Sequence, residues 1–180
     1  MKNPPKKSQK KKQKSSPQDY ITNWMVERVE KIYPEFGNMP MCPYARKARL
    51  DGKVKLLWIS ANEDDGNCWI HINNCDFKKT DVLILIADRK RWTWRELYKI
   101  RLDMNRIFNP QNITVLEDHP DYKESVAGVT VTNGRYALLF AQRRDKLNRF
   151  ANILKNTSDY YKKWSSKSYD DVVTWREDPK

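Results

Sequence analysis

The sequence predicts an α+β fold in which a mixed β-sheet is covered by about three helices. Three observations lead to this prediction: amphipathic segments with clear start signals, short aliphatic runs between them, and enough apolar residues for a core. The chain has 180 residues, of which 39% are hydrophobic and 12% aromatic. These values fit one folded domain of ordinary size.

Three segments have the marks of helices. The first begins at Ser16–Asp19, where a serine cap precedes a proline and an acidic residue, and is expected to stop near Pro34. The second begins at Thr93, which forms a capping-box pattern with Glu96, and apolar residues then recur at helical spacing. The third is an amphipathic segment at 145–156.

Strands are expected between and after these helices, at 53–60, 82–87, 113–116, 128–132 and 136–141. The run at 82–87 is apolar without alternation, as in a strand that is covered on both faces. The segment Cys68–Ile72 indicates a further short strand, on a weaker pattern. Asn133-Gly134 predicts a hairpin that joins the last two strands.

The two ends of the chain differ in composition from the domain expected at 16–156. Residues 1–15 offer almost nothing to bury and are expected to form a disordered tail. Residues 157–180 mix aromatic and charged side chains, and are expected to wrap over the surface or to contact a protein partner. The net charge is +12, and seven of these positive charges lie in the tail, on Lys2, Lys6, Lys7, Lys10, Lys11, Lys12 and Lys14.

The composition also bears on where the protein works. No apolar run approaches the roughly 20 residues that span a bilayer, and no apolar segment follows the basic N-terminus as in a secretory signal. Three cysteines are an odd number and too few for a secreted disulfide scaffold. A cytoplasmic location with reduced thiols is therefore expected.

Cys42 is the first candidate for chemistry. It lies between Pro40 and Pro43, where a following helix would place the thiol at a helix N-terminus close to Arg46 and Lys47. The helix dipole and these cations would lower the thiol pKa and favour a reactive thiolate. The alternative is a structural cysteine buried between two prolines.

His119 is the second candidate, with Asp121 and Tyr122 beside it just past a predicted strand. A histidine flanked by carboxylates suits an acid or a base in catalysis. The alternative is a solvated turn, since Pro120 and Asp121 are common turn residues.

A metal site is the third candidate. Cys68, His71 and Cys75, with Cys42 upstream, supply four ligands of the type that zinc takes. In a strand, however, Cys68 and His71 would point to opposite faces, and no second pair of closely spaced ligands follows. Core cysteines and a surface histidine are the preferred interpretation, so we assign no metal ligands and identify no cofactor.

Short motifs resemble those of an uncharacterised bacterial domain family. The family has a Trp-containing first helix, a Leu-Cys-Pro-Phe-Ala motif and a His-Pro-x-Tyr motif. They would correspond to Trp24, Met41–Ala45 and His119–Tyr122, within a similarity over about 20–155. The resemblance implies a similar architecture and nominates Cys42 and His119, but implies no reaction.

This chain departs from the family pattern after Thr132-Asn133, because Phe140 or Ala141 stands where the family has a histidine. If that histidine is functional in the family, its activity would be lost here. The lysine tail lies outside the resemblance. The abundance of lysine, asparagine and aromatic residues also resembles the style of phage proteins.

A basic stripe is expected on the helix that begins at Thr93. Arg95, Lys99 and Arg106 fall on one side at 100° per residue, opposite the apolar side, and Arg91 would join them if the helix extended back one turn. Trp92 adds an aromatic ring, and basic residues with aromatic rings suit phosphate contact and base stacking. The alternative is an ordinary solvated helix face.

These observations favour a nucleic-acid-associated accessory protein that makes largely non-specific phosphate contacts. The tail lysines would attract nucleic acid or another polyanion, and the helix stripe would add a second set of contacts. One alternative is a small cytosolic enzyme, redox or metal-dependent, that uses Cys42 and His119. A second alternative is a structural subunit of a larger assembly.

Overall fold

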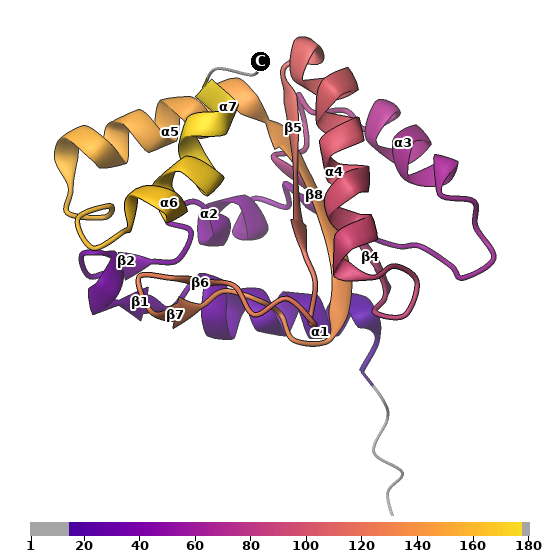
Figure 1. Ribbon diagram of the computed structural model, residues 1–180, viewed down its shortest axis with the longest axis horizontal. Coiled ribbons are helices and arrows are strands. Elements are labelled where there is room, and N and C mark those ends of the chain that lie inside the picture. Colours follow the sequence, from indigo (N-terminus) through magenta and orange to yellow (C-terminus); the bar gives the residue numbers. More distant parts are fainter. Residues whose placement is uncertain (1–14, 178–180) are drawn as a thin grey trace, which may run out of the picture.

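A computed structural model describes residues 15–177 and shows an α+β domain built on a four-stranded mixed sheet (Figure 1). The strand order is β3-β4-β8-β5; β3 is parallel to β4, and β8 is antiparallel to both of its neighbours. The strands of this sheet are β3 Val54–Trp58, β4 Val82–Asp88, β5 Ile113–Asp118 and β8 Tyr136–Arg143. The predicted α+β class with a mixed sheet is therefore confirmed.

One face of the sheet is covered by α3 (Gly66–Asn73) and α4 (Trp94–Phe108), which stand side by side in Figure 1. Between the sheet and these helices lies a hydrophobic core, in which Leu83 and Leu85 of β4 pack together with Leu97 of α4. The expected capping box starts α4, because the Thr93 hydroxyl accepts from the Glu96 N–H at 3.3 Å. The helix continues into a 3₁₀ turn at Asn109–Gln111.

The opposite face is covered by α1 (Pro17–Trp24), its π-helical continuation (Met25–Val29) and α2 (Ala45–Leu50). Ile84 and Ile86 of β4 point to this side and share a core with Ile21. Both faces of β4 are thus buried, which explains why its apolar run shows no alternation.

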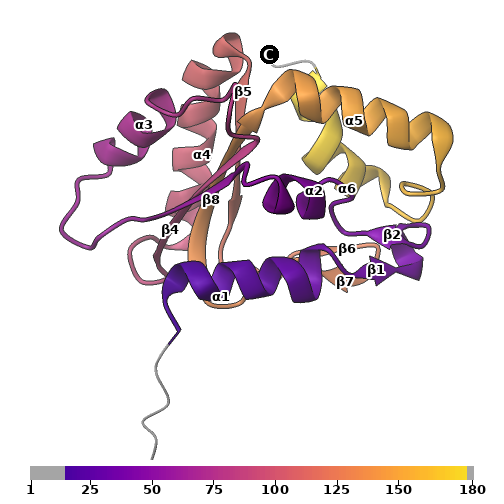
Figure 2. The same ribbon diagram turned by 180° about the vertical axis from the view of Figure 1, so that it is seen from behind.

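A third core lies beside the sheet and joins segments that are far apart in the sequence (Figure 2). It is centred on Tyr33, Phe36, Val126, Leu154 and Tyr160. Its residues come in part from β1 Ile32–Tyr33, a 3₁₀ turn Pro34–Phe36, β2 Met39–Pro40, β6 Ser125–Val126, β7 Val129–Thr130 and α5 Arg144–Thr157. The C-terminal part of the fold adds α6 Ser166–Tyr169, a π-helical turn Asp170–Thr174 and α7 Trp175–Glu177. The segment 157–177 is therefore integral to the fold, with Tyr160, Val173 and Arg176 buried.

Two local predictions were wrong. Cys68–Ile72 lies in helix α3, with both residues buried on one side of the helix, because a short apolar run does not distinguish a strand from a buried helix. The predicted hairpin at Asn133-Gly134 is absent from residues 15–177: β7 pairs with β6, and β8 instead pairs with β4 and β5. Long-range pairing inside the core prevails over the local turn signal.

None of the helices within residues 15–177 is long and apolar enough to cross a membrane.

Candidate functional site

The loops that follow three of the strands meet at one edge of the sheet. Strands β3, β4 and β5 run in the same direction and end at Trp58, Asp88 and Asp118, and β8 begins at the same edge with Tyr136. Helix α4 also starts here (Figure 1). We call this the carboxyl edge; in open α/β sheets, the carboxyl ends of strands are where ligands commonly bind.

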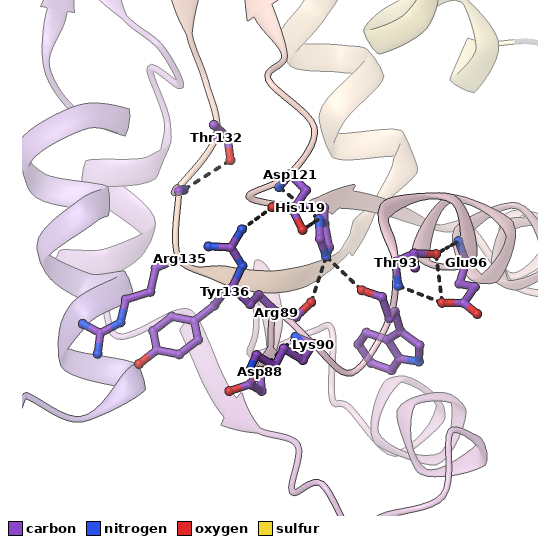
Figure 3. Close-up of polar contacts among 12 residues, drawn as sticks. Asp88, Arg89, Lys90, Thr93, Glu96, His119, Asp121, Thr132, Arg135 and Tyr136 are labelled. Carbon is purple, nitrogen blue, oxygen red and sulfur yellow. Dashed lines mark hydrogen bonds and ion pairs between the residues drawn. The ribbon is translucent and has the colours of Figure 1, made fainter.

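His119 lies at the centre of the carboxyl edge and is 3% exposed. Its Nε2 lies 2.9 Å from the carbonyl oxygen of Trp92 and 3.1 Å from that of Arg89, while its Nδ1 accepts from the Asp121 N–H at 3.1 Å (Figure 3). These partners assign the proton to Nε2. Both ring nitrogens are engaged by backbone groups, so His119 fastens the β4–α4 turn to the loop after β5.

The neighbours of His119 in the sequence face outward. Asp121 forms an ion pair with Arg89, and its carboxylate lies 3.8 Å from the His119 ring (Figure 3). The Tyr122 ring is half exposed and stacks on Trp94, with the ring centres 5.1 Å apart. The predicted group of His119, Asp121 and Tyr122 is thus a turn held by a buried histidine, with an ion pair and an aromatic ring on its surface.

Asn133 organises the loop that leads into β8. Its N–H and side-chain amide donate to one oxygen of Asp118 at 2.8 and 2.6 Å, and its own side-chain oxygen accepts from the Tyr136 N–H at 2.8 Å. Burial raises the pKa of Asp118, although the donors from Asn133 oppose the shift. These bonds place Arg135 on the surface, over the rings of Tyr20 and Tyr136.

Arg91 and Trp92, expected beside the basic stripe, are directed inward. Helix α4 begins only at Trp94, so Arg91 is not on it. The Arg91 guanidinium donates to two carbonyl oxygens of the loop before α3 and to Asp65, and its side chain is only 10% exposed. Trp92 is buried in the core, and the following tryptophan of the segment, Trp94, takes the surface position.

The stripe residues on α4, Arg95, Lys99 and Arg106, are all exposed, as expected from their spacing. Arg106 is paired with Asp103 at 2.7 Å. Between residues 15 and 177, five exposed cations on or beside the carboxyl edge form no ion pair: Lys90, Arg95, Lys99, Lys123 and Arg135. The predicted contacts at Lys6, Lys7, Lys10, Lys11, Lys12 and Lys14 lie outside the described residues.

The sequence alone did not single out three surface residues of the carboxyl edge, Lys90, Trp94 and Arg135. Arg135 lies between the Asn133-Gly134 turn signal and the strand predicted at 136–141, and no role was predicted for it. Its position beside Tyr20 depends on contacts across more than a hundred residues, which no local pattern reports.

Cys42 does not have the lowered pKa that its position predicted. The N–H groups of Tyr44 and Ala45 at the start of α2 lower the thiol pKa, but burial outweighs them and raises it. The Cys42 N–H donates to Val29, and the thiol packs against the core below α1 and α2, whereas both nitrogens of His119 are engaged elsewhere. This geometry gives no support to an enzyme built on Cys42 and His119.

The proposed zinc ligands are also dispersed by the fold. Cys68 and His71 lie on helix α3, so the expectation that they occupy opposite faces of a strand was wrong. Cys68 is nevertheless buried in the core, and burial raises the pKa of its thiol to about 11. His71 is 3.5 Å from Glu63 on the surface. Within residues 15–177 no group of three or more metal-ligating side chains comes together.

Comparisons with known proteins find no match: no family model, no curated protein and no solved structure resembles this chain significantly.

Proposed function

We propose that the protein binds nucleic acid through non-specific phosphate contacts, using the lysine-rich N-terminal segment together with the exposed cations of the carboxyl edge. The observation that carries this proposal is the position of the first turn of α1. The Tyr20 hydroxyl donates to the Asn133 carbonyl oxygen at 2.9 Å, and its ring packs edge-on against Tyr136. The first turn of α1, which follows the lysine-rich segment in the sequence, therefore lies beside Arg135.

Charge on the folded domain supports the same proposal. Lys90, Arg95, Lys99 and Arg135 extend from the start of α1 across the carboxyl edge and onto α4. Among the nearby acidic groups, Asp121 is paired with Arg89, whereas Glu96 and Asp88 accept hydrogen bonds from the Thr93 and Lys90 N–H groups. Clustered cations on one face attract a polyanion and direct it to that face.

The experiment measures oligonucleotide affinity across a salt series for the full chain and for a chain that begins at Ser15. The shorter chain is expected to bind more weakly and with a smaller salt slope, but still measurably. In this shorter chain, the triple variant Arg95→Gln, Lys99→Gln, Arg135→Gln is expected to reduce the slope by about 2, since each lost phosphate contact removes roughly 0.7–0.9.

A matched control removes three positive charges elsewhere. Lys55, Lys78 and Lys79 are exposed and lie at the opposite end of the sheet, near the starts of β3 and β4. Their glutamine variant is expected to keep most of the slope. Equal slopes for the two triple variants, or no binding by the shorter chain, would contradict the proposal that the folded domain itself contacts phosphates.

A further inference from the structure

The carboxyl edge carries an exposed, stacked pair of aromatic rings. Trp94 is the first residue of α4, and Tyr122 lies in the loop after β5. Their ring centres are 5.1 Å apart with an angle of 27° between the planes, and the side chains are 36% and 48% exposed. Apolar side chains are common on surfaces as single residues, whereas a stacked and exposed pair is an apolar surface without a partner in the described chain.

Both rings are held by fixed backbone. The capping box formed by Thr93 and Glu96 sets the start of α4 directly before Trp94. The Tyr122 N–H donates to the His119 carbonyl oxygen at 3.0 Å, and the His119 ring ties this loop to the carbonyl groups of the β4–α4 turn. Little conformational freedom remains to be lost when a flat ligand stacks on such a pair.

Positive charge lies beside the pair. The Arg95 guanidinium lies 5.2 Å from the centre of the Trp94 ring, and the unpaired Lys90 lies on the turn that leads into α4. The same His119 ring joins this turn to the loop of Tyr122 (Figure 3). Aromatic rings beside cations match a ligand that carries both flat rings and phosphates, because the bases stack while the phosphates pair with the cations.

We propose that the Trp94–Tyr122 pair is a stacking platform for an unpaired nucleobase, so that the protein prefers single-stranded nucleic acid to a duplex. This inference rests on the proposed function and adds a preference to it. In a duplex the faces of the bases are covered by their neighbours, so only a single strand offers a base to Trp94 and Tyr122. Phosphate contacts alone would bind both forms.

The test compares the affinity of the full chain for an oligothymidylate with its affinity for a duplex of the same length, across a salt series. The double variant Trp94→Leu, Tyr122→Leu is expected to lose roughly tenfold in affinity for the single strand, as for the loss of one stacked base. Its affinity for the duplex and its salt slope are expected to stay as in the wild type, because no cation is changed.

The conservative variant Trp94→Phe, Tyr122→Phe keeps two rings and is expected to retain most of the single-strand affinity. Tyr98→Leu, also on α4 and 43% exposed, removes one ring outside the pair and is expected to change little. If the leucine variant does not fold, the platform is tested by the phenylalanine variant and by the affinity of the wild-type chain for the single strand compared with the duplex.

The two proposals fail in different ways. If neither the single strand nor the duplex shows salt-dependent binding, the proposed function itself is overturned. Salt-dependent binding of equal strength to both forms, or a folded leucine variant with wild-type affinity for the single strand, would overturn the platform alone.

Discussion

Replacing His119 with alanine tests whether this histidine is a structural tie. The ring bonds three backbone groups: the carbonyl oxygens of Arg89 and Trp92 and the N–H of Asp121. A buried backbone group that loses its partner costs about 1–3 kcal/mol, and the removed ring also leaves a cavity. With partial relaxation of the turn, we expect His119→Ala to lower the free energy of unfolding by about 3–5 kcal/mol.

His119→Gln separates hydrogen bonding from packing. A glutamine amide has two N–H donors for the two carbonyl oxygens, so only the Asp121 N–H loses its partner, and the expected cost is about 1–2 kcal/mol. Urea unfolding followed by circular dichroism measures both variants, with a constant m value as the sign that the folded state is unchanged.

The control for this series is His71→Ala. His71 is a surface residue whose single ion-pair contact, to Glu63, is 3.5 Å long, so its loss should change the free energy of unfolding by no more than about 0.5 kcal/mol. A cost below about 1 kcal/mol for His119→Ala, or equal costs for alanine and glutamine, would refute the reasoning.

Two further predictions concern buried polar groups. Asn105→Ala should lower the free energy of unfolding, measured by urea unfolding, by about 2–4 kcal/mol. The reason is that the Asn105 amide bonds both the N–H and the carbonyl oxygen of Val115 on the edge strand β5, at 2.7 and 2.8 Å. A loss below about 1 kcal/mol would contradict this prediction. Glu124→Gln should raise the free energy of unfolding near neutral pH but not at acidic pH. Burial, and then the charges of Glu117 and Asp118, raise the pKa of Glu124 above 4.5, so the stability that its protonated form contributes is lost as the pH rises through the folded-state value. Urea unfolding at the two pH values measures the difference, and equal effects at both would contradict it.

Residue spacing alone predicted part of the exposed surface at the carboxyl edge. Spacing placed Arg95 and Lys99 on the exposed side of α4, since a helix that buries its apolar side must expose the opposite one. Trp92 was expected to add an aromatic ring to this surface because it adjoins the basic residues, whereas the structure buries Trp92 and exposes Trp94. Trp92 lies before the helix and Trp94 is its first residue, so helical spacing does not predict which of them faces the core. The geometry of the turn around His119 decides it.

The sequence by itself determined the elements whose hydrogen bonds and packing are local. The caps at Ser16 and Thr93 and the helical spacing after them define α1 and α4, and the unbroken apolar run of β4 requires cover on both faces. Only the tertiary structure decided the pairing of β8 and the burial of His119. Those outcomes depend on contacts between segments distant in sequence, which bury more apolar surface and satisfy more backbone groups than a local hairpin at Asn133-Gly134 would.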